Sequence, residues 1–249
     1  MAGHSQFKNI MYRKGAQDAK RAKMFAKLGR EIMVSVRGGL PDPAFNPRLR
    51  SALAAARAAN MPKDNIDRAI KKALGEGDGA HYEEVHYEGY GPGATAFIVE
   101  GLTDNRNRTA PEIRSAFTKF GGNLGETGSV NFMFNRIGYV CYPLSIGAYE
   151  SVFEAVLEAG AENLEKEEEK YEIVSTIEGF GAVRDFLFAK YGDPLEAKII
   201  WRPIAMISCD EGAASSILKL IEVLEDNDDI QNVYTNASIS DEILQKLMP

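Results

Sequence analysis

The spacing of the apolar residues changes at a glycine-rich segment, residues 75–80. Before it, Phe25, Leu28, Ile32 and Val36 recur every three or four residues, which places them on one face of a helix. After it, apolar runs of strand length alternate with helical stretches. A change of period of this kind excludes a single helical bundle, and it predicts a helical domain followed by α/β structure.

The first part of the chain contains signals for helices at three places. Residues 16–36 have no Pro and are dominated by good helix formers. A second helix is expected to begin at Asn46, as the N-cap, with Pro47 in the first helical position. A third begins near Pro62 and ends at Gly75. We therefore predict a small three-helix domain, residues 1–78, that includes a basic N-terminal arm.

The remaining sequence predicts two α/β domains, of which one is inserted in the other. Residues 138–201 have the order βαββαβ, which is the ferredoxin-like pattern. On either side are strand–helix–strand sets, and a capping box at Thr109–Glu112 is expected to start the first helix of these sets. The predicted fold class is thus α+β and multidomain: an N-terminal three-helix domain followed by two ferredoxin-like α/β domains. The predicted ranges are 1–78 for the helical domain, 79–136 plus 203–249 for the discontinuous middle domain, and 137–202 for the inserted domain.

The flanking sets were assigned strand by strand. We expect strands at 94–101 and 130–134 around a helix at 109–120. After the insertion we expect a strand at 204–208, a helix at 211–224 and a strand at 230–234. These six elements would give the middle domain a second strand–helix–strand pair.

Charge is divided unequally along the chain. Residues 1–75 contain sixteen Lys and Arg against five Asp and Glu, a balance of +11. The remaining residues contain thirteen against thirty-one, a balance of −18, and the whole chain carries −7. A basic segment joined to acidic domains indicates a polyanionic partner for the basic part, with nucleic acid as the first candidate.

Cations occupy one face of the first predicted helix, roughly opposite its apolar face. They are spaced by three and four residues: Lys20, Lys23, Lys27 and Arg30. Only Asp18 and Glu31 interrupt this helix with negative charge, whereas an ordinary solvated face mixes both signs. The pattern favours contact with phosphates over a merely solvated face.

A second candidate anion site is the loop Asp104–Thr109, which leads into a helix N-terminus and contains Arg106 and Arg108. Backbone N–H groups and the helix dipole would suit an anion or RNA phosphate there. A polar loop whose Asn side chains bind its own backbone is an equally good interpretation. The glycines at 121–125 resemble a GXXG loop but have no basic neighbours, and those at 89–93 indicate a turn between strands.

The sequence contains no convincing catalytic or metal-binding set. Its three His and two Cys residues have no zinc-like spacing, and no segment approaches the length of about 20 apolar residues that spans a bilayer. The start of the sequence lacks a secretory h-region, and the cysteines lie far apart. We expect a cytoplasmic protein that is not an enzyme, with no cofactor, metal or membrane partner; its oligomeric state is not predicted.

Several strings of the first 135 residues resemble the YebC-type family of transcriptional regulators, which has a mitochondrial branch of translational activators. These strings are MAGHSQFKNI, RKGAQDAKRAKMFAKLGREI, NPRLR, AANMPKDNIDRAIKK, YEGYGPG, LTDNRNRT and GGNLGETGSVNFMF. The resemblance implies three domains, a cytoplasmic location, association with nucleic acid and no catalysis. Members of the family usually have Lys-Trp where this chain has Gln6-Phe7.

The resemblance also implies which side chains contact nucleic acid, and Arg30 joins them from the helix periodicity. The predicted surface comprises Lys8, Arg13, Lys14, Lys20, Arg21, Lys23, Lys27 and Arg30. Two functions fit these residues: a DNA-binding regulator of transcription, and a ribosome-associated translation factor that contacts rRNA or tRNA. The basic face is mainly Lys, which suits phosphates better than bases, and it does not separate DNA from RNA.

Overall fold

The fold was taken from a computed structural model, which describes residues 17–75 and 81–247. The chain divides into two compact units. One consists of Met1–Lys27, Ala80–Asn135 and Arg202–Pro249, and the other of Leu28–Gly79 and Arg136–Trp201. No helix in the described ranges is both long and apolar enough to cross a bilayer.

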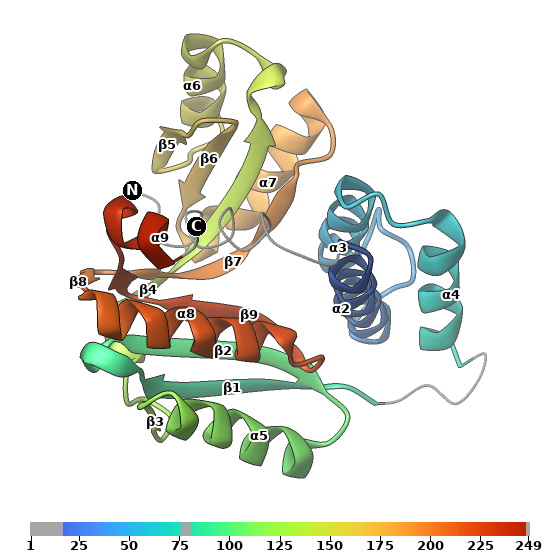
Figure 1. The fold of residues 1–249 in the computed structure, drawn as a ribbon. Coiled ribbons are helices and arrows are strands. Elements are labelled where there is room, and N and C mark those ends of the chain that lie inside the picture. Colours follow the sequence, from blue (N-terminus) through green and yellow to red (C-terminus); the bar gives the residue numbers. More distant parts are fainter. Residues whose placement is uncertain (1–16, 76–80, 248–249) are drawn as a thin grey trace. The chain divides into compact units, whose positions relative to one another are not determined.

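Three helices form the N-terminal part: α2 (Gln17–Arg37), α3 (Pro47–Ala58) and α4 (Lys63–Ala73) (Figure 1). The predicted apolar face of α2 supplies Ile32 and Val36, which are 0% and 4% exposed. Leu49 of α3 is also fully buried. In α4 only Ala69 is buried, while Ile66 and Ile70 are half-buried. Burial of apolar side chains stabilises α2 and α3 as helices, and α4 to a smaller extent.

Asn46 fixes the turn between α2 and α3. Its Oδ1 accepts a hydrogen bond from Leu49 N at 3.0 Å, which caps α3 as the sequence predicts. Its amide group donates to Ser35 O at 2.7 Å and to Leu40 O at 2.8 Å. One buried side chain therefore both starts α3 and pairs carbonyl groups at the end of α2.

The middle sheet is built from two distant parts of the chain. Its members are β1 (Glu83–Tyr90), β2 (Ala96–Thr103), β3 (Asn123–Leu124) and β9 (Ile230–Thr235), in the order β3-β1-β2-β9. Helices α5 (Arg106–Lys119) and α8 (Glu211–Asp226) cover one face of this sheet (Figure 1). Phe97 and Phe117 meet edge to face in the core between sheet and helices, with ring centroids 5.8 Å apart.

The second sheet is formed by the residues that lie between β3 and α8. Its elements are β4 (Phe134–Pro143), α6 (Tyr149–Glu158), β5 (Asn163–Lys166), β6 (Lys170–Ser175), α7 (Ile177–Tyr191) and β7 (Glu196–Pro203). The strand order β5-β6-β4-β7 is that of a ferredoxin-like fold. Val140, Val152 and Leu187 belong to its separate core. The predicted fold class is confirmed.

The two sheets share one spatial order but differ in the path of the chain. In the second sheet the third strand of the chain, β6, lies between the first and the second. In the middle sheet the same place is taken by β1, which comes first in the chain and pairs antiparallel with both β2 and β3. The strands of the middle domain therefore have the spatial order of a ferredoxin-like sheet, but they follow one another along the chain in a different order.

Smaller elements complete the described chain. They are the 3-10 turns η1 (Pro92–Ala94), η2 (Asn131–Met133) and η3 (Leu144–Ile146), a parallel pair of strands β8 (Ile207–Ser208) and β10 (Ala237–Ser238), and helix α9 (Asp241–Leu247). The predicted turn at 89–93 is confirmed, since it joins β1 to β2. The antiparallel strands β5 and β6 are joined by a turn at three consecutive glutamates, residues 167–169.

Three predicted details are wrong. The strand expected at 130–134 is mainly the turn η2, because backbone N–H groups there bind a buried carboxylate instead of a neighbouring strand. Only Ile207–Ser208 of the strand expected at 204–208 is extended and paired, and it pairs with β10 outside the middle sheet. Helix α5 begins before Thr109, because Asn105 is its N-cap and leaves Thr109 buried in the first turns.

The predicted domain ranges can be tested by excision of the inserted segment. Ile204 N donates to Met133 O at 3.0 Å, so the chain enters and leaves the insertion at adjacent points. We expect a protein in which Arg136 is joined to Pro203 by three glycines to keep the middle sheet and unfold cooperatively in urea. The isolated segment 137–202 should also unfold cooperatively. Loss of cooperativity in the excised protein with both a three- and a six-glycine linker would contradict the predicted ranges.

Candidate nucleic-acid interface

The structure accounts for only part of the predicted basic surface. Lys8, Arg13 and Lys14 lie outside the described residues. Lys20 lies in α2, near the start of that helix. Arg21 is exposed, and its guanidinium carbon lies 5.3 Å from the centre of the Phe25 ring. Arg30 is half-buried.

Two lysines of the predicted surface are engaged by acceptors within the protein. Lys23 Nζ forms an ion pair with the Asp226 carboxylate and lies 3.2 Å from the backbone oxygen of the same residue. Lys27 Nζ donates to Glu225 O at 2.7 Å. A phosphate that bound these two ammonium groups would have to replace those contacts. This lowers their expected contribution to nucleic-acid binding.

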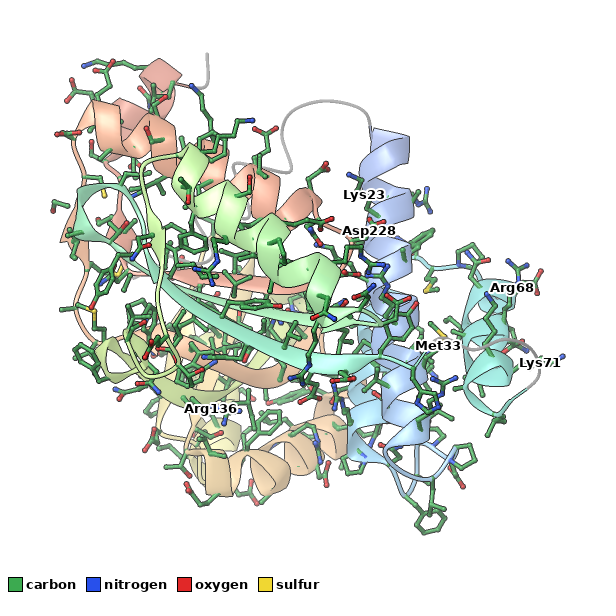
Figure 2. All side chains as sticks on the ribbon, turned by 90° about the horizontal axis from the view of Figure 1, so that it is seen from below. Lys23, Met33, Arg68, Lys71, Arg136 and Asp228 are labelled. Carbon is green, nitrogen blue, oxygen red and sulfur yellow. The ribbon has the colours of Figure 1, made fainter. Side chains whose placement is uncertain are left out.

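Helix α4 carries three cations that the sequence analysis did not select. Arg68, Lys71 and Lys72 are exposed and occupy its last two turns. Among the described residues, none of the three has a carboxylate partner, whereas Arg48 of α3 pairs with Glu31 at 2.7 Å. Figure 2 shows Arg68 and Lys71 on the outer side of α4. We call these three residues the α4 cation cluster.

The sequence signal for the α4 cation cluster was present but was interpreted differently. Ile66, Ile70 and Leu74 recur every four residues, and with Pro62 and Gly75 at the two ends they predict this helix without reference to its cations. The three cations occur at i, i+3 and i+4, the spacing that brings side chains together on a helix. Asp64 lies in the first turn of α4 and Asp67 directly before Arg68, so residues 68–73 contain only positive charge.

The two arginines of the candidate anion loop already have carboxylate partners. Arg106 Nε lies 2.7 Å from Glu83 Oε2. Arg108 Nη2 lies 2.6 Å from Asp229 Oδ2 and 2.9 Å from Asp104 Oδ1. Asn105 caps the helix by accepting from Arg108 N at 3.2 Å. This geometry favours the alternative of a polar loop bound to its own chain.

Asp229 is the centre of this loop's hydrogen-bond network. It is 3% exposed, and its Oδ2 accepts hydrogen bonds from Thr109 at 2.7 Å and Thr103 at 3.1 Å, besides Arg108. Burial raises the pKa of a carboxyl group, but Arg108 and the two hydroxyl groups outweigh it and hold the pKa of Asp229 below its usual value. The network joins the start of α5 to the start of β9 and is structural.

The glycines near residue 122 serve close packing between β1 and β3. A Cβ on Gly122 would lie 2.6 Å from Tyr90 O, and one on Gly89 would lie 2.7 Å from Asn123 O. Such distances are impossible for real side chains, so this part of the sheet requires glycine. Close packing of the backbone therefore explains why glycines occur here in a pattern that resembles a phosphate-binding GXXG loop.

Glu88 binds the loop that follows β3. It is 2% exposed, and its carboxylate accepts from Gly128 N at 2.9 Å, Val130 N at 2.8 Å and Asn131 N at 2.9 Å. Burial raises its pKa, but these donors together with His86 outweigh that effect and lower it. The Glu88 carboxylate thus accepts the backbone hydrogen bonds that a neighbouring strand would have accepted if residues 130–134 formed the predicted strand.

The remaining titratable groups do not form a reactive site in the described ranges. Burial raises the pKa of the Cys141 thiol to about 11, so this group is protonated and weakly nucleophilic at neutral pH. Glu165, Glu167 and Glu172 offer carboxylate oxygens within 4.8 Å of one another. Lys170 Nζ lies 2.6 Å from Glu172 Oε1 and supplies positive charge where a cation would sit.

Family models match both parts of the chain. The TACO1/YebC N-terminal domain matches residues 5–76, and the TACO1/YebC second and third domain matches residues 82–237. A conserved hypothetical protein of Aquifex aeolicus, Aq1575, has a crystal structure with 46% sequence identity and a TM-score of 0.83. The match covers 94% of this chain and 96% of that one.

These matches define a three-part protein of the kind that regulates transcription or translation. The chain belongs to the TACO1/YebC family. The resemblance noted from the sequence is confirmed.

The Glu88 network predicts a pH-dependent stability. Glu88→Gln should lower the free energy of unfolding by about 1–3 kcal/mol at pH 7, because an amide cannot accept all the backbone donors. Since the folded pKa is depressed, the stabilisation is present above the ordinary value of 4.5 and is lost as the pH falls through the folded pKa. Urea titrations of both proteins should therefore converge at low pH.

Glu126→Gln is the matched control, because Glu126 is an exposed carboxylate of the same loop. It should change stability by less than about 0.5 kcal/mol at every pH. A Glu88→Gln protein as stable as the wild type at pH 7 would contradict the role assigned to this carboxylate.

Proposed function

We propose that this protein is a non-enzymatic regulator that binds nucleic acid through the phosphate backbone, using its N-terminal helices. The observation that carries the proposal is the α4 cation cluster, whose charges have no carboxylate partners among the described residues. The cluster lies in residues 1–75, whose net charge is +11, while the rest of the chain carries −18. This difference in net charge supports binding of a polyanion by the N-terminal part.

The cations favour phosphate contact over reading of bases. Lys71 and Lys72 are flexible point charges, and no Asn or Gln shares α4 with them except Asn65 near its start. Specific readout of a major groove typically uses Arg, Asn or Gln in bidentate contact with base edges. In the α4 cation cluster the one arginine, Arg68, stands with two lysines and with no Asn or Gln beside it. We therefore expect the proposed regulator to bind with little dependence on sequence.

We propose DNA as the target of a transcriptional regulator and a cytoplasmic location for it. The free thiols of Cys141 and Cys209 fit a reducing compartment. Ribosome-associated binding of rRNA or tRNA is the second candidate, and contact of the α4 cation cluster with phosphates fits RNA as well as DNA. The described residues offer no converging nucleophile and base, which supports a function without catalysis.

The cluster makes a quantitative prediction for binding. Each phosphate contact contributes about 0.9 to the slope of log K against log salt on B-DNA. Arg68→Ala, Lys71→Ala and Lys72→Ala together should flatten the slope by about 2–3 and weaken binding almost equally on unrelated duplexes. The same substitutions at Lys23 and Lys27 should change the slope by less than about one, because both ammonium groups are held by α8.

The matched control removes three exposed lysines from the α/β domains: Lys119, Lys166 and Lys219. Their replacement by alanine changes the net charge equally and should leave the slope within about 0.5 of the wild type. Fluorescence anisotropy across a salt series measures all four proteins. A loss confined to one preferred duplex, or an equal loss in the control, would contradict the proposal.

The choice between DNA and ribosomal RNA needs a separate experiment. If the partner is the ribosome, the full-length protein should sediment with ribosomes, and the α4 triple variant should not. Treatment with RNase should release the wild-type protein, whereas DNase should not. Release by DNase alone would assign the association to DNA.

A further inference from the structure

Helix α6 has an apolar row on its solvent side in addition to its buried face. Val152, Ala155 and Val156 are buried. Tyr149, Phe153 and Leu157 are 38%, 40% and 59% exposed. Their spacing of four residues places them along one side of the helix. Single exposed apolar residues are ordinary on protein surfaces, but an ordered row is not.

The aromatic members of this row are arranged as a pair. The rings of Tyr149 and Phe153 stack with centroids 6.0 Å apart and an angle of 18° between their planes. Leu157 continues the row by one turn. Aromatic side chains of this kind dominate the energetics of protein interfaces, because they bury a large area at small entropic cost. We call the three residues the α6 row.

A row of carboxylates runs beside the α6 row. Glu150, Glu154 and Glu158 are exposed and have the same spacing of four. The helix itself contains no Lys or Arg, and Lys190 of α7 lies with its Nζ 3.8 Å from Glu158 Oε2. The surface is therefore apolar along one line and negative along the next.

We propose that the α6 row, with its flanking carboxylates, is a docking surface for a positively charged amphipathic segment of another protein. Apolar side chains of that segment cover Tyr149, Phe153 and Leu157, while its Lys or Arg residues pair with the three glutamates. Charge complementarity of this kind orients the partner and speeds association. The inference does not depend on the proposed nucleic-acid function.

Charge excludes the two simplest other occupants. Phosphates of a nucleic acid would be repelled by three adjacent carboxylates. A second copy of the same chain, placed across a two-fold axis on α6, would bring two rows of glutamates together with no cation on either helix. A basic segment neutralises the carboxylates and covers the apolar row in one contact.

The full-length protein can be tested with a defined probe. The probe is a fluorescein-labelled 14-residue peptide of Leu and Lys in helical amphipathic order, and the reference peptide has Glu in place of each Lys. We expect the Lys peptide to bind at least about tenfold more tightly than the Glu peptide. Phe153→Ser with Leu157→Ser should weaken binding of the Lys peptide by at least about tenfold.

Two further variants keep the test decisive. Glu150→Gln, Glu154→Gln and Glu158→Gln together change only exposed groups, and should weaken binding and flatten its salt dependence. Phe132→Ser with Ile204→Ser removes two exposed apolar side chains elsewhere, 66% and 60% exposed, and should leave binding unchanged. Circular dichroism and urea midpoints identify any variant that does not fold, in which case the triple Gln variant decides.

Three results would overturn the proposal. They are equal binding by the wild type and the folded α6 variants, equal affinity for the Lys and Glu peptides, and a wild-type dimer that the α6 variants dissociate in analytical ultracentrifugation. The last result would assign the row to a second copy of the chain.

Discussion

The middle domain depends on the pairing of β2 with β9, because this contact joins parts of the chain that are far apart in sequence. Leu102 N donates to Asp229 O at 2.7 Å, and Thr103 reaches the Asp229 carboxylate across 126 residues of sequence. The two strands approach so closely at Gly101 that a Cβ there would lie 2.5 Å from Asp229 O. The register of the two strands shifts at this point, and the Asp229 carboxylate accepts a hydrogen bond from Thr109 of α5. The fold therefore requires glycine at 101, because a side chain there would collide with the backbone of residue 229. It uses aspartate at 229 because the carboxylate binds Thr109 of α5.

Local signals in the sequence predicted the elements whose stability is local. The helix expected at 16–36 is α2, and Asn46 caps α3, because apolar period and cap chemistry both act within a few residues. The second sheet was predicted as well, because its six elements follow one another directly along the chain in the order βαββαβ. The predicted start of α5 at Thr109 was wrong: Thr109 and Glu112 have the spacing of a capping box, but the Thr109 hydroxyl donates to the Asp229 carboxylate instead. A partner 120 residues away leaves no local trace.

In the candidate interface too, the position of the cations along a helix can be read from the sequence, whereas their ion pairs with residues far away in the chain cannot. The sequence predicted a basic face on α2, but it could not reveal that the Asp226 carboxylate and the Glu225 carbonyl bind two of its lysines, Lys23 and Lys27. Arg108 resembled an anion ligand until the carboxylates of Asp104 and Asp229 were seen beside it. Charge periodicity predicts where cations lie, while three-dimensional pairing decides which of them are available to a ligand. The α4 cation cluster emerges only from that second criterion.

The permuted path of the middle sheet has a consequence for synthesis of the protein. Translation delivers β1, β2, α5 and β3 first, then the whole of the inserted sheet, and only then α8 and β9. The hydrogen-bonding edge of β2 is thus left open while more than a hundred residues are added between Thr103 and Ile230. The inserted domain is complete in one continuous stretch and can fold during that interval, since domains fold as units during elongation. The sheet that is started first is thus closed by a strand that is made only after the inserted domain is complete, so nascent chains that stall before β9 expose an unpaired strand edge.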